Sequence, residues 1–311
     1  MQTVRLGRTD AVVGCVGLGS GGSRLGLTRG ASAEEAARIV RSAIDLGVTF
    51  IDTAPMYETE EVVGRGIAGR RSEVFLSSKV SPVHGAQMLT AEELVESLHG
   101  SLSRLGTDHI DLFHLHGMTA EQYDYCAERL LPELKRRQRM GAIRFLGVSE
   151  MYRIDTRHEM LARCLPDDHF DVVMTGFNFI NPSARRTVFP QTIEHDVGTL
   201  LMFSARRPMR DLEALRALTE ALIARGELNP ERIDPGAPLR FLTEHPDIAS
   251  VAEAAFRFCR HEPGAHVILT GTGDVGHLQQ NIAAVQKPPL PIEVLDRLRD
   301  LFGSVDSVPG S

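Results

Sequence analysis

Four side chains in the N-terminal half of the chain have the chemistry of acid–base catalysis: Asp52, Tyr57, Lys79 and His116. They follow three short apolar runs, Val48–Ile51, Val74–Leu76 and Ile110–Phe113. A carboxylate, a phenol, an ammonium and an imidazole can together hold, donate and accept protons. If the runs are successive parallel strands, their carboxyl ends meet at one edge of a sheet, where parallel α/β folds carry their active sites. The pattern therefore predicts an enzyme.

The composition is that of an ordinary globular protein. The chain has 311 residues, of which 42% are hydrophobic and 24% charged, and its formal net charge is −7. This acidic balance, with arginines dispersed among Asp and Glu, argues against a general nucleic-acid binder. No apolar run approaches the roughly 20 residues of a membrane span, so we expect no membrane partner.

The N-terminus and the cysteines indicate a reducing compartment. Val12–Cys15 is similar to a bacterial lipoprotein cleavage box, but Asp10 interrupts the short apolar stretch before it. The four cysteines form no Cys-x-x-Cys pair: Cys15, Cys126, Cys164 and Cys259. The sequence thus predicts no metal site and no disulfide framework. We expect a cytoplasmic protein with buried free thiols, and the sequence leaves the oligomeric state open.

Helix-start signals recur from residue 33 onward. Capping boxes at Ser32–Glu35, Thr90–Glu93 and Thr119–Gln122 predict three helices. The first should end near Leu46 and the third near Gly141.

Eight short apolar runs alternate with the expected helices: Val16–Leu18, Val48–Ile51, Val74–Leu76, Ile110–Leu115, Ile143–Val148, Val172–Thr175, Thr199–Phe203 and Val267–Leu269. Their continuous apolar character suits parallel strands that are buried on both faces. The fold class is therefore α/β, and eight such units favour a (β/α)₈ TIM barrel. An open doubly wound sheet is the alternative, but Gly17–Gly22 only loosely imitates its glycine signature.

Two segments lie outside the repeating pattern of a single domain spanning residues 1–311. Thr3–Leu6 and Ala11–Val13 predict a hairpin within residues 1–14 that closes the barrel floor. Residues 205–248 form an insertion after the seventh strand, with a helix near 210–225. A lid over the active site and a solvated excursion are both compatible with this insertion. Before it, Asn181–Pro182 predicts a further helix start.

Several segments in order resemble the signatures of the aldo-keto reductase superfamily: Asp52–Gly64, Leu76–Val80, Ser97–His116, Gly147–Glu150 and Thr270–Asn281. The resemblance extends over essentially the whole chain. It implies a nicotinamide-dependent oxidoreductase in which Asp52, Tyr57, Lys79 and His116 are the catalytic residues. Tyr57 would carry the proton, Lys79 would ease its release, and His116 would orient the substrate carbonyl. His114 has the same side chain and strand parity, but we expect it to pack inside the barrel.

The resemblance also implies a cofactor, NADP(H), with NAD(H) as the alternative. The cofactor-binding positions it indicates are Gly19, Ser20, Asp52, Ser149, Glu150, Met174, Phe203, Ser204, Gly271, Thr272, Gly273, His277, Gln280 and Asn281. Gly271–Asp274 before a helix is typical of a phosphate-binding turn. Phe203 is expected to stack on the nicotinamide, and an ordinary barrel-lining role is its alternative.

Three of these positions depart from the family. Glu150 stands where the family has Asn, and Met174 stands where it has Gln, so amides that would hold the carboxamide are missing. Glu150 can still accept from the carboxamide NH₂. His277 stands where NADP-preferring members often place an arginine, which grips a 2′-phosphate more strongly than histidine does.

The leading hypothesis is an enzyme that interconverts a carbonyl (an aldehyde, a ketone or a sugar) and its alcohol. The alternative is a nucleotide-binding barrel that serves as a sensor or regulatory subunit. With no Trp in the chain, we expect the substrate wall to be built from Met56, Val83, Met118, Phe179 and lid residues. The sequence does not name the substrate or the direction of the reaction.

Overall fold

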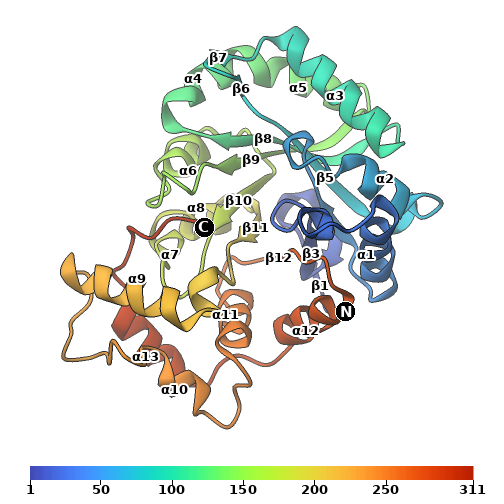
Figure 1. Cartoon of the computed structure of the whole chain (residues 1–311). Helices are drawn as coiled ribbons and strands as arrows, with labels where there is room; N and C mark the ends of the chain where they lie inside the picture. The colour runs from blue at the N-terminus through green and yellow to red at the C-terminus, as the bar shows by residue number, and fades with distance from the viewer. Residues whose placement is uncertain (311) are drawn as a thin grey trace.

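The computed structural model describes residues 1–310 and contains a closed barrel of parallel strands surrounded by helices (Figure 1). The barrel strands are β3 (Val16–Gly19), β4 (Phe50–Asp52), β5 (Phe75–Val80), β8 (Ile110–Met118), β9 (Ile143–Glu150), β10 (Val172–Gly176), β11 (Gly198–Met202) and β12 (Val267–Thr270). The last strand pairs in parallel with the first, with Ile268 opposite Val16, and this pairing closes the barrel. All eight predicted strands are present, and the (β/α)₈ prediction is confirmed.

The predicted N-terminal hairpin is also present. Strands β1 (Thr3–Arg5) and β2 (Val12–Gly14) pair antiparallel. Leu6 and Val13 belong to the same apolar cluster as Phe50 of the barrel interior. The hairpin therefore closes one end of the barrel, and the chemistry lies at the other end.

The helices that surround the barrel are α1 (Ala33–Asp45), α2 (Glu60–Ile67), α3 (Ala91–Leu105), α4 (Tyr123–Tyr125), α5 (Leu131–Arg139), α6 (Glu159–Cys164), α7 (Ala184–Thr187), α8 (Phe189–Glu194), α11 (Val251–Arg260), α12 (Val275–Val285) and α13 (Ile292–Phe302). The capping boxes at Ser32 and Thr90 form as predicted. A small hairpin, β6 (Val83–His84) and β7 (Gln87–Met88), lies between β5 and α3.

Two predicted helices are interrupted. The helix expected from Thr119 to Gly141 contains a π-helical segment, Cys126–Leu130, before α5 begins. Pro132 lacks the N–H that would bond four residues back, so the helical ladder is disturbed just before it. The helix expected after Asn181 begins at α7, and Pro190 in the first turn of α8 marks a second break.

The insertion after β11 contains α9 (Leu212–Ala224) and α10 (Arg240–Thr243), which confirms a helix near 210–225. It packs against α13 at one flank of the barrel (Figure 1). Arg232 forms an ion pair with Asp300, and the Arg297 guanidinium lies 4.4 Å from the ring centroid of Phe241. A lid function for residues 205–248 stays a prediction.

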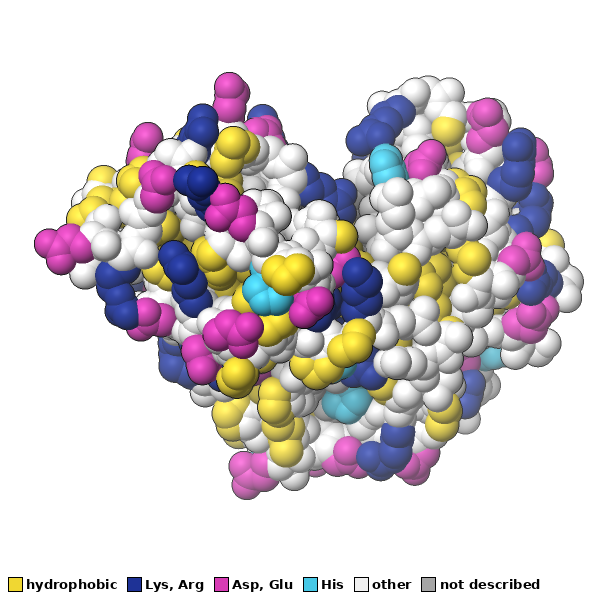
Figure 2. Space-filling model, turned by 90° about the horizontal axis from the view of Figure 1, so that it is seen from below, with side chains coloured by type: hydrophobic (Ala, Val, Ile, Leu, Met, Phe, Trp, Pro, Cys, Tyr) yellow, Lys and Arg dark blue, Asp and Glu magenta, His cyan; other side chains and the backbone are white. Residues whose placement is uncertain are grey.

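On the face shown in Figure 2, basic and acidic side chains are interspersed. Within residues 1–310, no helix is at once long and apolar enough to cross a membrane. In the same part of the chain, no group of three or more His, Cys, Asp or Glu side chains is arranged to hold a metal ion. All four cysteines are buried and free.

Two helical glycines offer a matched test of the packing between helices. A Cβ on Gly66 of α2 would lie 2.4 Å from the Cβ of Val40 on α1, whereas a Cβ on Gly100 of α3 would meet only the flexible end of Arg104, at 2.9 Å. We predict that Gly66→Ala lowers the free energy of unfolding by about 1–3 kcal/mol through overpacking. Gly100→Ala should instead raise it by up to about 1 kcal/mol, because alanine favours helices. Urea denaturation of both variants measures the two effects, and equal effects of one sign would contradict the packing described.

Candidate active site

The barrel interior is layered. Near the floor its side chains are apolar and include Phe50, Phe75 and Leu112. Two residues further along β4, the inward position is Asp52, since side chains alternate along a strand. The same parity brings Lys79 of β5 and His116 of β8 to the carboxyl-end mouth. The strands thus bring together three of the four predicted catalytic side chains.

Asp52 and Lys79 form a buried ion pair. The Lys79 ammonium donates to both Asp52 carboxylate oxygens at 2.6 Å and to the carbonyl of Thr53 at 2.9 Å. The Ser77 hydroxyl donates a further bond to Asp52 at 2.9 Å. The exposed fractions of the two charged side chains are 0% for Lys79 and 4% for Asp52. The pair is therefore held by direct contacts away from solvent.

Tyr57 completes the set from the 3₁₀ turn Pro55–Tyr57 that follows β4. Its hydroxyl lies 3.1 Å from Nε2 of His116, and the two rings are perpendicular. The Lys79 ammonium lies 5.0 Å from the centroid of the Tyr57 ring. A Cβ on Gly21 would lie 2.9 Å from Cζ of Tyr57, so only glycine lets this loop support the ring.

The environment at the mouth shifts the pKa values of Tyr57 and His116, and both shifts favour the neutral side chain. Burial raises the pKa of Tyr57, Lys79 opposes the rise, and Asp52 adds to it. Burial and the charge of Lys79 lower the pKa of His116 to about 3. His116 is therefore neutral near neutral pH, and its single N–H can serve as a hydrogen-bond donor.

His114 packs inside the barrel, as predicted. It is fully buried, and its Nδ1 lies 2.4 Å from the place that a Cβ on Gly147 would occupy. Burial, with smaller effects of Lys79 and His116, lowers the pKa of His114 well below its usual value.

A cavity of about 420 Å³ opens beside Lys79 and His116. Met56 and Val83 are among its lining residues, as expected for a substrate wall. Met118 and Phe179 are buried in the main core instead, and Phe179 packs on other phenylalanine rings. The expectation that these two residues face the substrate is wrong, because they point into the layer between strands and helices.

Two glycine turns meet on the other side of the mouth. A Cβ on Gly271 would lie 2.8 Å from the carbonyl oxygen of Gly19, so the ends of β12 and β3 approach closely. Helix α12 follows, capped by the Asp274 carboxylate, which accepts from the His277 N–H at 2.7 Å. The His277 side chain is exposed.

Several predicted cofactor positions are already engaged with the protein. The Ser20 hydroxyl is buried 2.7 Å from that of Thr59. Ser149 accepts from the Gly117 N–H at 2.8 Å, and Asn281 donates to the Thr270 hydroxyl at 2.7 Å.

Three further positions are buried or partly covered. Met174 lies in the apolar interior cluster, and Ser204 is buried. The Phe203 ring stacks on Tyr152, with centroids 5.8 Å apart.

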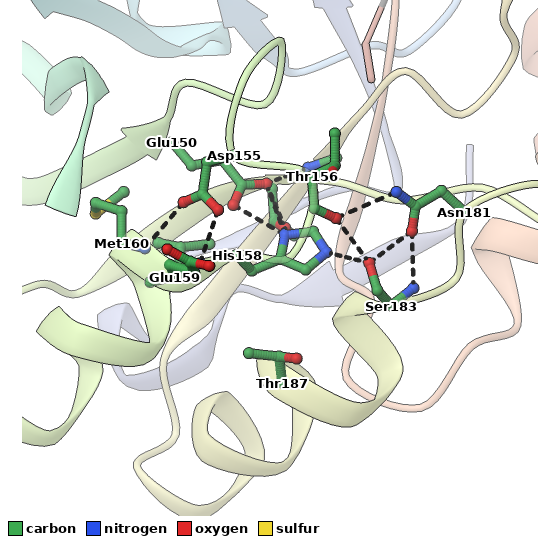
Figure 3. Close-up of polar contacts among 12 residues, drawn as sticks. Glu150, Asp155, Thr156, His158, Glu159, Met160, Asn181, Ser183 and Thr187 are labelled. Atoms are coloured by element: carbon green, nitrogen blue, oxygen red, sulfur yellow. Dashed lines mark hydrogen bonds and ion pairs between the residues drawn. The ribbon is translucent and has the colours of Figure 1, made fainter. Parts of the chain in front are cut away.

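Glu150 does not face the mouth. Its carboxylate accepts from His158 Nδ1 at 2.9 Å, from the Thr175 hydroxyl at 2.9 Å and from the Gly176 N–H at 2.8 Å. His158 Nε2 in turn lies 2.8 Å from the hydroxyl of Ser183 (Figure 3). The expected contact of Glu150 with a carboxamide is therefore not what the geometry offers. Strand parity sends this last residue of β9 outward, into a buried network between the strands and the helices.

Comparison with known proteins decides the family. Residues 17–302 match the Aldo/keto reductase family. The chain belongs to this family. Its expected activity class, an NAD(P)(H)-dependent oxidoreductase, is confirmed at that level.

The relatives cover nearly the whole chain. It is 24% identical to the uncharacterized oxidoreductase YqkF of Bacillus subtilis, with 96% of each chain covered. It is 26% identical to the L-galactose dehydrogenase of Arabidopsis thaliana, with 97% of this chain and 92% of that one covered.

Solved structures agree with this assignment. Aldo-keto reductase AKR11C1 from Bacillus halodurans, in its holo form, has a TM-score of 0.73 at 23% identity over 98% of this chain and 97% of that one. An aldo/keto reductase from Klebsiella pneumoniae in complex with NADP and acetate has a TM-score of 0.66 at 25% identity, with 96% and 95% covered.

The residues of this aldo/keto reductase fit NADP(H) at the phosphate end. The backbones of Gly271 and Gly19 approach closely before the capped N-terminus of α12, and His277 and Gln280 are exposed on its first turns. The cofactor supplies hydride chemistry when bound. At the nicotinamide end, the predicted stacking residue Phe203 is partly covered by the protein itself.

Three residues of the site were not expected from the sequence: Gly21, Tyr152 and His158. Gly21 lies in a glycine-rich segment whose spacing carried a weak signal for nucleotide binding, not for tyrosine support. Tyr152 and His158 lie in the loop after β9 and have no local motif. Only the three-dimensional contact with Phe203 and Glu150 brings them into the site.

The buried ion pair makes a testable energetic prediction. Lys79→Met leaves the Asp52 carboxylate buried without its cation, so we expect unfolding to become easier by about 3–5 kcal/mol. Combining it with Asp52→Asn should recover part of that loss, because no charge is then left unpaired. Lys287→Met, which breaks the half-exposed pair with Glu253, is the control and should cost about 1 kcal/mol or less. Urea denaturation of all variants gives the comparison, and similar losses for the two lysines would contradict the buried pair.

Proposed function

We propose that this aldo/keto reductase interconverts small carbonyl compounds and their alcohols with NADP(H), using Tyr57 as the proton donor and acceptor. The observation that carries the proposal is the Tyr57 hydroxyl 3.1 Å from neutral His116, with the Lys79–Asp52 pair beside the ring. A proton donor, a neutral hydrogen-bond donor and a fixed cation therefore share one mouth.

In the reducing direction, a carbonyl oxygen placed between Tyr57 and His116 accepts hydrogen bonds from both. His116 can donate because its pKa of about 3 leaves it neutral. As negative charge develops on the oxygen, the Tyr57 proton moves to it, and the ammonium of Lys79 stabilises the resulting phenolate. The hydride for the carbonyl carbon would come from NADPH when it is bound. In the reverse direction, the Tyr57 phenolate accepts the proton of the alcohol.

The cavity beside His116 supports small substrates. Its volume of about 420 Å³ is at the small end of ligand pockets. Its walls combine apolar Met56 and Val83 with polar Ser81 and Ser97. A short aldehyde, ketone or sugar has the matching mixture of apolar and hydroxyl groups.

NADP(H) is preferred here over NAD(H) because the family uses it and because the Klebsiella relative is in complex with NADP. His277 is exposed one turn into α12, where it would meet the adenosine ribose. The stacking of Tyr152 on Phe203 favours one alternative, which is a barrel that binds nucleotide and has little or no enzymatic turnover.

The first test removes the proton donor alone. We expect Tyr57→Phe to keep NADPH binding and to lower kcat for aldehyde reduction by about two to four orders of magnitude. Tyr123→Phe, whose hydroxyl bonds Asp167 on the outer layer, is the control and should keep kcat. Steady-state kinetics over a panel of aldehydes, ketones and sugars measures both. Near wild-type turnover by Tyr57→Phe would remove Tyr57 from its role, and no turnover by the wild type on any compound would favour the binding-protein alternative.

The second test concerns the cofactor. His277→Arg adds a permanent charge that can form a bidentate bond with a 2′-phosphate, and a charge-assisted bond is worth about 1.5–3 kcal/mol. We therefore expect NADPH to bind roughly ten-fold more tightly, an effect that added salt should weaken. NADH lacks the 2′-phosphate and is the built-in control. If both cofactors respond alike, or neither does, His277 does not face the 2′ position.

A further inference from the structure

An aromatic stack fills the nicotinamide end of the mouth. The Tyr152 ring stacks on Phe203 at 5.8 Å and on His158 at 5.5 Å between centroids. A Cβ on Gly176 would lie 2.3 Å from the Tyr152 ring, so the ring takes the space that a side chain at this inward position would need. Tyr152 is 1% exposed, which leaves neither face of its ring open to a ligand.

The end of the chain covers this stack. We call residues 303–310, which follow α13, the C-terminal strap. From α13 the strap returns toward the centre of the molecule in Figure 1. The Gly310 N–H donates to the Tyr152 carbonyl at 3.4 Å, and a Cβ on Gly310 would lie 2.5 Å from Cε2 of Phe203. Val305 and Val308 are buried.

The outer bonds of the strap are polar and lie near the surface. The Ser307 hydroxyl donates to Glu227 of the insertion at 2.7 Å, and Arg157 donates to Asp306 at 3.2 Å. The Arg157–Asp306 bond is exposed and contributes little, because water competes for it, whereas the Ser307–Glu227 bond is partly buried. The inner contacts are buried: Val305 and Val308 lie in the main core, and Asn181 bonds the Val308 carbonyl. Lifting the strap breaks these contacts, so the open form is a minority.

The other side of the stack is rigid. Asn181 uses its Nδ2 to hold the Val308 carbonyl at 3.0 Å, and its Oδ1 accepts the Ser183 hydroxyl at 2.5 Å. His158 Nε2 lies 2.8 Å from the Ser183 hydroxyl, and His158 Nδ1 lies 2.9 Å from the Glu150 carboxylate. His158 and Glu150 are both fully buried in the network of Figure 3. This network fixes the loop that carries Tyr152.

We propose that the C-terminal strap gates the nicotinamide end of the site, and that the cofactor reaches Phe203 only when the strap lifts from Tyr152 and Phe203. The proposal rests on the proposed function only in taking NADP(H) as the ligand. The closed arrangement lowers the fraction of molecules able to bind, and apparent affinity falls with that fraction. Glu227 links the gate to the insertion, so residues 205–248 support the strap from outside.

The test measures how fast NADPH binds, by stopped-flow detection of the cofactor's own fluorescence in a Tyr57→Phe background that cannot turn over. Ending the chain at Gly303 removes the gate. If the open form is a minority of about one molecule in ten, the association rate constant should rise about ten-fold, with a matching fall in Kd.

Point variants protect the test against misfolding, since truncation also removes buried Val305 and Val308. Asp306→Asn combined with Ser307→Ala keeps the whole chain and loosens only the outer bonds, so the rate constant should rise by a smaller factor. Ser304→Ala, at an exposed position of the same strap, is the matched control and should leave it unchanged. Urea denaturation checks that each variant is folded.

An association rate constant that is unchanged or lower in the folded truncated chain would overturn the gate, as would a fall in Kd that comes only from slower release. Failure of every variant to bind NADPH would overturn the gate and the cofactor assignment together. Gated binding without turnover in the chain with Tyr57 intact would leave the gate standing and overturn the proposed function alone.

Discussion

The active site depends on an ion pair that the barrel keeps away from water. Lys79 and Asp52 come from adjacent parallel strands, and the register that pairs Asp52 with Ser77 brings the ammonium two residues later to the carboxylate. Water would weaken this attraction several-fold, and its exclusion makes the cation a fixed part of the mouth. A one-residue slip of either strand would turn its charged side chain outward and separate the pair, so the register of the barrel and the ion pair are one constraint.

The same exclusion of water shifts the pKa values of His116 and Tyr57, which lie beside the pair, in opposite directions. It keeps His116 neutral, since burial and Lys79 both oppose a second proton on the ring. It also raises the pKa of Tyr57, because burial outweighs the help that Lys79 gives to the phenolate. Both shifts favour the neutral forms of the two side chains at the mouth.

The predicted nicotinamide end differs from the amides that the resemblance to the family implies. Met174 and Gly176 place no polar side chain on the inner face of β10, and the space over Gly176 is filled by the Tyr152 ring. Glu150, which stands where the family has Asn, bonds the buried His158 side chain instead. These changes are coupled: the glycine admits the tyrosine, the tyrosine stacks on Phe203, and the strap packs on both.

Sequence alone predicted the elements and the polar side chains that meet at the mouth, because both rest on local signals. Apolar runs predict buried strands, capping boxes predict α1 and α3, and the strand-end positions of Asp52, Lys79 and His116 predict a shared mouth. The tertiary structure decided which way individual side chains face and which distant residues they contact. It turned Glu150 away from the mouth, buried Phe179 in the core, and brought Tyr152 and Gly310 onto Phe203, although the two lie far apart in the chain. Such contacts depend on the path of loops and on the space left by neighbours, and no local pattern in the sequence encodes them.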